Sequence, residues 1–345
     1  MFISKTICFR ICLIIFWLVS VLCNEVIAQT KGNPINEKEI QIDSSDNYSF
    51  FVSGHFHGSS QNTSGLPAVT VRKNIDQINQ QQVNFMVCLG DLFMDIKNDI
   101  PAYKKHLIDR LKMPLYNVPG NHDKSGKIYE ENFGKTFYYF KIRSELYVFL
   151  DTEMDDGNIT GAQLSMMKEA VRDLRGIKNI FVFAHRLIWA EEHPKMKHLF
   201  TDNTRSNGGN NFRDEILPLL EKTGKNFFIM GGSLGNSPSP FFYFNDQKIT
   251  YIATAIRDTP KDAFLLVEIN NGKVNFSAFP LVMPVEYYDL KYYNNSVKPA
   301  PGFNWRLVPL YIKTMLTHRY FWYGILMIFI PLISLWGYRK RRRKN

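Results

Sequence analysis

Short apolar runs alternate with helix-like segments between residues 48 and 279, and this alternation constrains the fold more than any other feature of the chain. The apolar runs have the length of strands, and several end abruptly at glycine or polar residues. Strands are predicted at 48–53, 84–90, 114–118, 137–140, 146–151, 179–184, 226–230, 249–253, 263–269 and 273–279. Helices are predicted at 68–80, 102–111, 162–174 and 212–220. Strands that alternate with helices pair through right-handed crossovers, so we expect an α/β fold built on a layered sheet.

The first 28 residues have the pattern of a secretory signal peptide. Lys5 and Arg10 give a positive start, residues 11–23 are almost all apolar, and Val26-Ile27-Ala28 offers a small-residue cleavage site before Gln29. Two alternatives stay open, a lipoprotein signal at Cys23 and an uncleaved anchor helix. The polar segment 29–47 is predicted to be a leader to a folded domain at 48–283.

Residues 320–338 contain no charged side chain and are predicted to form one C-terminal transmembrane helix. An apolar segment of about 19 residues just crosses a bilayer, and the aromatic residues near its ends suit the interfaces. Residues 339–345 form a basic tail, which the positive-inside rule keeps in the cytoplasm. The pattern predicts a single-pass type I membrane protein, with a juxtamembrane stalk at 284–319 and the ectodomain outside the cytoplasm (periplasm, cell surface or secretory lumen). A buried core helix and a processed sorting signal are the alternatives.

The net charge of +10 does not indicate a nucleic-acid partner. Six of the positive charges lie in the C-terminal tail and two in the predicted signal peptide, which leaves about +2 on the ectodomain. Three of the four cysteines also lie in the predicted signal peptide, so Cys88 is alone in the mature chain. An intramolecular disulfide is therefore excluded, and the domain depends on its apolar core.

Polar motifs follow four of the predicted strands. In chain order they are His55-x-His57, Gly90-Asp91, Gly120-Asn121-His122-Asp123 and His185. Taken singly, the first, second and fourth motifs are most simply turn or loop features. Ligands bind outside the carboxyl ends of strands in open α/β sheets, so four such motifs together predict one metal-binding site.

These motifs, in this order, resemble those of the calcineurin-like metallophosphoesterases, and the likeness spans residues 48–279. The resemblance implies a layered β-sandwich flanked by helices, with two divalent ions that bind phosphate oxygens and generate the nucleophile. It makes Asp91 the bridging ligand. It also assigns Asn121 and His185 to one ion and His57 to the other. His122 would stabilise or protonate the leaving oxygen, with Asp123 orienting its ring.

The chain departs from the family pattern at two motifs. His55 stands where the family has an aspartate, and Gly232 and Leu234 stand where it has the histidines of Gly-His-x-His. His55, His57 and Asp91 remain for one ion, and Asp91, Asn121 and His185 remain for the other. We therefore expect one or two divalent ions, weakly held, with zinc, iron or manganese favoured by the histidine ligands. His193 and His198 lie in a predicted loop and are candidates for substitute ligands, although solvent-exposed loop histidines are the simpler interpretation.

Two functions follow from this pattern. The first is a metal-dependent phosphoesterase that hydrolyses a phosphomonoester or a phosphodiester outside the cytoplasm; its substrate is unknown. The second is an inactive protein of the same fold that serves as a membrane-tethered binding or scaffold module. The complete Gly-Asn-His-Asp motif favours the enzyme, whereas the three substituted ligand positions favour the binding module.

Overall fold

The computed structural model describes residues 32, 34–42, 47–190, 193–196, 210–234, 241–282, 305 and 308–342. The predicted signal peptide at 1–28, the end of the basic tail, His198 and most of the predicted stalk lie outside the described residues.

The domain contains two β-sheets. The first sheet has the strand order β11-β10-β1-β2-β3. Its strands are β1 (Asn47–Ser53), β2 (Phe85–Cys88), β3 (Leu115–Asn117), β10 (Ala263–Asn270) and β11 (Lys273–Pro280). The second sheet has the order β4-β5-β6-β7-β9-β8. Its strands are β4 (Tyr138–Ile142), β5 (Glu145–Phe149), β6 (Asn179–Ala184), β7 (Asn226–Gly231), β8 (Phe241–Asp246) and β9 (Ile249–Thr254). Strands β1-β2-β3 and β5-β6-β7-β9 run parallel, and antiparallel strands flank both blocks.

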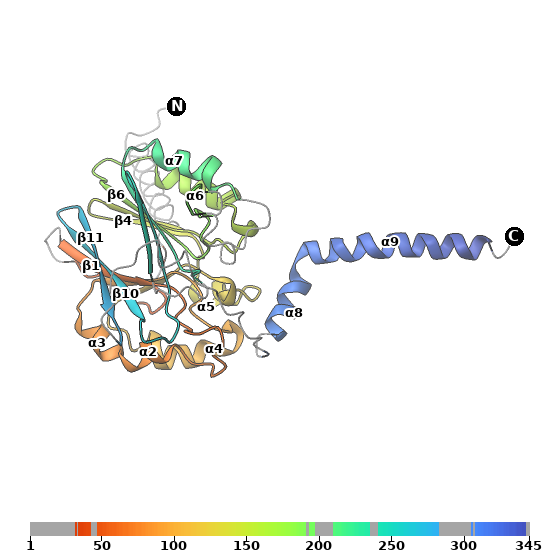
Figure 1. The fold of residues 1–345 in the computed structure, drawn as a ribbon, viewed down its shortest axis with the longest axis horizontal. Coiled ribbons are helices and arrows are strands. Elements are labelled where there is room, and N and C mark those ends of the chain that lie inside the picture. Colours follow the sequence, from red (N-terminus) through yellow and green to blue (C-terminus); the bar gives the residue numbers. More distant parts are fainter. Residues whose placement is uncertain are drawn as a thin grey trace, which may run out of the picture.

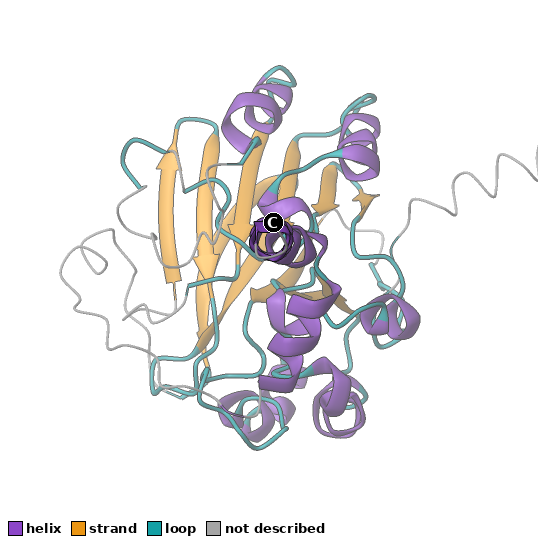
Figure 2. Ribbon diagram, turned by 90° about the vertical axis from the view of Figure 1, so that its right-hand side faces the viewer, coloured by secondary structure: helices purple, strands orange, loops and turns teal. Residues whose placement is uncertain are grey.

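Helices lie on the outer faces of both sheets (Figure 1 and Figure 2). Those beside the first sheet are α2 (Val69–Lys73), α3 (Ile75–Gln80), α4 (Ile96–Tyr103), η1 (Lys104–Ile108) and α5 (Ile128–Phe133). Those beside the second are α6 (Gly161–Ala170), η4 (Phe212–Ile216) and α7 (Leu217–Glu221). The short helices η2 (Asn121–Asp123) and η3 (Asp155–Gly157) lie in loops, and α8 (Val308–Thr317) and α9 (Arg319–Arg342) end the described chain.

The space between the two sheets is filled mainly by aromatic side chains. Phe50 stacks on Phe85 within the first sheet, with ring centroids 4.5 Å apart, and meets Phe181 of the second sheet edge-on at 5.5 Å. Two further apolar clusters fill the spaces between each sheet and its helices. These three cores give four layers, helix–sheet–sheet–helix, which confirms the expected β-sandwich flanked by helices.

The predicted elements differ from the observed ones in a few places. The helix expected at 68–80 is two helices, α2 and α3, separated at Asn74. The helix expected from residue 102 begins earlier, at Ile96, because Asp95 caps it and accepts a hydrogen bond from the Lys97 amide. Strand β8 was not predicted; it pairs antiparallel with β9 across a short turn at Gln247, whose φ of 58° is left-handed.

The C-terminal segment predicted to cross a membrane is helical, and it forms most of α9. Figure 1 shows α9 extending away from the sandwich. Among the helices that the structure describes, none combines the length and the apolarity of a membrane span. The transmembrane helix predicted at 320–338 is therefore not confirmed.

Candidate metal centre

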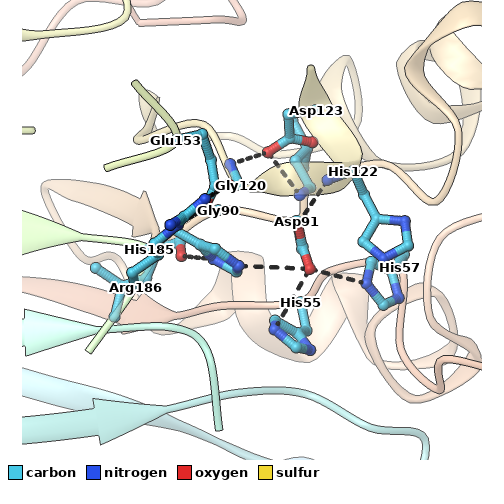
Figure 3. Close-up of polar contacts among 12 residues, drawn as sticks. His55, His57, Gly90, Asp91, Gly120, His122, Asp123, Glu153, His185 and Arg186 are labelled. Atoms are coloured by element: carbon cyan, nitrogen blue, oxygen red, sulfur yellow. Dashed lines mark hydrogen bonds and ion pairs between the residues drawn. The ribbon is translucent and has the colours of Figure 1, made fainter. Parts of the chain in front are cut away.

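The polar motifs meet because the carboxyl ends of parallel strands meet. In the first sheet Ser53 of β1 pairs with Cys88 of β2, which in turn pairs with Asn117 of β3. The second sheet joins the same edge through Gly54, whose amide donates to Thr254 at 3.0 Å and whose carbonyl accepts from Ile256 at 2.9 Å. The segments that follow β1, β2, β3 and β6 are thereby brought to one place (Figure 3).

Asp91 lies at the centre of this group with its side chain only 2% exposed. One carboxylate oxygen, Oδ2, is 3.5 Å from His55 Nε2 and 3.6 Å from the Nε2 atoms of both His57 and His185. The other oxygen, Oδ1, accepts a hydrogen bond from the His122 amide at 3.0 Å. Three predicted metal ligands, His55, His57 and His185, and the predicted catalytic histidine are thus collected around a fourth predicted ligand, Asp91 (Figure 3).

The histidine nitrogens that face Asp91 fit a metal ion. The Nε2 atoms of His55, His57 and His185 are buried, and among the described residues none has a hydrogen-bond partner. Their distances to Oδ2 exceed those of ordinary N–H···O bonds. Leaving three polar atoms buried and unsatisfied is costly, whereas imidazole and carboxylate together are a good donor set for a borderline divalent ion. The ligand atoms of His55, His57 and Asp91 also lie within 4.8 Å of one another.

The electrostatic environment of Asp91 and His55 favours the protonation states that bind a cation. Burial alone would raise the pKa of Asp91, but the four surrounding histidines outweigh it and hold that pKa well below its ordinary value. Burial lowers the pKa of His55 well below its ordinary value, in spite of the attraction of Asp91. Asp91 is therefore anionic and His55 neutral at neutral pH, which are the protonation states that bind metals.

The backbone at the site is unusual, and two glycines make it possible. Asp91 and His55 adopt left-handed φ values of 53° and 54°, which are strained for residues with a side chain. A Cβ on Gly120 would lie 2.3 Å from Asp91 Oδ1, and a Cβ on Gly90 would lie 2.5 Å from His185 Nδ1. The glycines of Gly-Asp and Gly-Asn-His-Asp are thus needed so that these loops can pack closely against His185 and Asp91.

His122 and Asp123 lie in η2, immediately after β3, together with Asn121. The carbonyl of Met94 lies 2.9 Å from His122 Nδ1, and since a carbonyl only accepts, Nδ1 carries the proton. The carboxylate of Asp123 accepts backbone N–H bonds from Leu92, Phe93 and Gly120 at 2.9–3.2 Å. The carbonyl of Met94 therefore orients the ring of His122, and Asp123 holds the loop that follows Asp91. Burial and the nearby charge of Asp91 raise the pKa of Asp123 to about 6.

Two ion pairs lie near these loops and were not predicted from the sequence. Arg186, directly after His185, makes a bidentate pair with Glu153, with both N···O distances 2.9 Å. Lys124, directly after Asp123, pairs with the buried Asp151. The partners lie about thirty positions apart in the chain, so no local pattern reveals them, although both carboxylates follow β5 and each cation adjoins a predicted site residue.

The two positions that lack the family's histidines lie at the end of β7. A Cβ on Gly232 would lie 2.1 Å from the carbonyl oxygen of Leu89, and the Leu234 side chain is fully buried in the apolar core beside the second sheet. His193, offered as a substitute ligand, lies beside the β8–β9 hairpin. Its ring contacts Phe244 and Tyr251, and its Nε2 is 3.9 Å from Asp246 Oδ2.

Replacing Gly232 with alanine is expected to destabilise the fold, because the new Cβ meets the main chain of Leu89 rather than a movable side chain. Overpacking of this kind costs about 1–3 kcal/mol, which urea denaturation measures as a lower free energy of unfolding. Gly324→Ala in α9 is the matched control, since its Cβ meets no described atom within 4 Å. Equal stability of Gly232→Ala and the wild type would contradict the close packing.

This chain is similar in sequence to a curated protein, a probable cyclic nucleotide phosphodiesterase from Fibrobacter succinogenes, 26% identical over 129 residues. That match covers 34% of this chain and 48% of the relative, so the chain spans about half the length of the curated relative it matches.

Two solved structures are also similar. A dimetal phosphatase from Danio rerio is 14% identical, with a TM-score of 0.49, over 68% of this chain and 96% of that one. A purple acid phosphatase from yellow lupin (Lupinus luteus) seeds is 11% identical, with a TM-score of 0.48, over 76% of this chain and 57% of that one.

The comparison with protein families gives the assignment. The model of the calcineurin-like phosphoesterases matches residues 67–239, which are 173 of the 345 residues. The matched segment includes Asp91, the complete Gly-Asn-His-Asp motif and His185. This chain belongs to the calcineurin-like phosphoesterase family.

Proposed function

We propose that the chain is a metal-dependent hydrolase of phosphoester bonds that acts on a phosphomonoester or a phosphodiester. The observation that carries this proposal is the convergence of three buried, unpaired histidine nitrogens on Asp91, with His122 beside them. Membership of the calcineurin-like phosphoesterases supports the same reaction class.

The chain's own residues divide the work. His55, His57 and Asp91 hold the ion, which when bound polarises phosphoryl oxygens and lowers the pKa of water. His122 is the proton donor to the leaving oxygen. Its ring lies 5.1 Å from that of His57, between centroids, and its Nδ1–H is fixed on the Met94 carbonyl, so Nε2 is the atom that transfers the proton.

The metal set is divergent from the family pattern. His55 replaces a carboxylate, and the ends of β7 and β2 pack so closely at Leu89 that Gly232 leaves no space for a side chain. A site with one carboxylate and several imidazoles favours zinc, iron or manganese over magnesium.

Hydrolysis by the purified full chain tests the proposed reaction. The chain is stripped with a chelator and then supplied separately with zinc, manganese, ferrous iron or magnesium, and aryl phosphomonoester and phosphodiester substrates are offered. We expect turnover of at least one substrate only after a borderline metal is returned, with magnesium the weakest activator. A folded, metal-loaded chain that hydrolyses neither substrate would overturn the proposal.

We propose further that the reaction takes place outside the cytoplasm. The support is the sequence of residues 1–28, with its positive start and apolar run. A reporter enzyme that is active only outside the cytoplasm, fused after residue 47, is expected to be active. The same fusion with Ile15→Asp in the apolar run serves as the control and is expected to be inactive. An inactive wild-type fusion would contradict export.

A further inference from the structure

The three imidazoles that face Asp91 Oδ2 are not equivalent. The ligand atoms of His55, His57 and Asp91 form one compact group within 4.8 Å. His185 approaches the same oxygen at 3.6 Å but does not belong to that group. His55 and His57 are thus close enough to share an ion with the carboxylate, whereas His185 reaches the same oxygen from the direction opposite to His57 (Figure 3).

Main chain fills the space beside His185 from which a further ligand would have to come. The Leu89 carbonyl lies 2.9 Å from His185 Nδ1 and is also the atom that a Cβ on Gly232 would strike, at 2.1 Å. A Cβ on Gly54 would in turn lie 2.8 Å from the Gly232 Cα. The ends of β1, β2 and β7 are packed backbone against backbone here, so a histidine at 232 would require three strands to separate.

The other missing histidine position is closed for a different reason. Leu234 is fully buried in the apolar cluster beside the second sheet, together with Ile188 and Trp189. Its backbone is held in a tight turn by the bond from its amide to the Gly232 carbonyl at 2.9 Å. Neither position offers a donor atom to the centre.

Charge balance points the same way. Of the four side chains His55, His57, His185 and Asp91, only Asp91 carries a negative charge. Two dications would therefore leave a large uncompensated positive charge in a buried site. A single dication with Asp91 leaves one net positive charge, which a substrate phosphate neutralises on binding.

We propose that this chain binds a single divalent metal ion, held by His55, His57 and Asp91, and that His185, which faces the same carboxylate oxygen, is not required to hold it. This inference rests on the proposed function only in taking this centre as the reaction site. The family pattern of two ions is thereby reduced to one by the closure of the strand ends at Gly54, Leu89 and Gly232.

Metal counting on the purified full chain tests this inference. The chain is loaded with zinc, desalted, and its metal content is measured by mass spectrometry; a manganese-loaded sample is examined by electron paramagnetic resonance. We expect one metal per chain and the hyperfine spectrum of an isolated manganese ion. His57→Ala is expected to lose the ion, whereas His185→Ala and the exposed control His318→Ala keep it.

The melting temperature is a second measurement, and it distinguishes the loss of the ion from the misfolding of a variant. A bound ion raises the melting temperature by mass action, so the zinc-induced shift should survive in His185→Ala and vanish in His57→Ala. The inference would be overturned by two metals per chain, by a spin-coupled manganese pair, or by a folded wild-type chain that binds no metal. It would also be overturned if His185→Ala lost the ion and His57→Ala kept it. One ion without hydrolysis would contradict the proposed function alone, and hydrolysis with two ions would contradict this inference alone.

Discussion

The substitution Asp91→Asn is expected to abolish metal binding and hydrolysis while the fold persists. Asparagine has nearly the same shape, but it removes the one negative charge onto which three histidine nitrogens converge. Loss of a partner outside the ligand set already lowers metal affinity about 10–100-fold, so loss of this ligand should raise the metal Kd by more than about 100-fold. Zinc titration followed by calorimetry measures the metal Kd. At a zinc concentration that saturates the wild type, kcat/KM of Asp91→Asn should also be lower than that of the wild type.

Asp173→Asn is the matched control for this substitution. Asp173 is exposed and pairs with Arg175 on the surface, so its replacement should leave the metal Kd and kcat/KM unchanged. If Asp91→Asn bound zinc as tightly as the wild type, the carboxylate would not be the centre of the site.

Replacement of His122 by alanine is expected to lower kcat about 10²–10⁴-fold, the usual contribution of a positioned proton donor, with metal content unchanged. The ring is anchored by Met94 rather than by the metal ligands, so its removal leaves the ligand set intact. The defect should also grow as the leaving alcohol becomes more basic, because a poor leaving group depends more on protonation. Rates for nitrophenyl and unsubstituted phenyl esters, measured side by side, give this dependence.

His106→Ala serves as the control for the loss of a histidine outside the site, in η1. Equal losses for both leaving groups in His122→Ala would contradict the proton-donor role, and a loss of bound metal would place His122 in the ligand set instead.

Much of the site could be predicted because it depends on strand ends. The apolar runs before His55, Asp91, Asn121 and His185 identify buried strands, and parallel pairing then brings their carboxyl ends to one edge. The sandwich itself follows from the same alternation together with the family resemblance. The structure also explains two glycines of these motifs, because Gly120 approaches Asp91 closely and Gly90 approaches the ring of His185 closely.

Other features of the site and fold could not be predicted, because they depend on contacts between residues far apart in the sequence or with the backbone. The absence of histidines at Gly232 and Leu234 is visible in the sequence, but the closure behind it involves Leu89, more than a hundred positions away. The carboxylate of Asp123 accepts hydrogen bonds from three backbone amides, and backbone partners of this kind cannot be read from a sequence. Strand β8 escaped prediction because it pairs only along β9, at the edge of its sheet.

Anomalous diffraction from crystals of the zinc-loaded chain, recorded across the zinc absorption edge, tests most directly whether these strand ends hold a cation. We expect one anomalous peak bounded by the imidazoles of His55 and His57 and the carboxylate of Asp91. A folded chain with no peak there, or with zinc bound only elsewhere, would contradict the assignment of this centre.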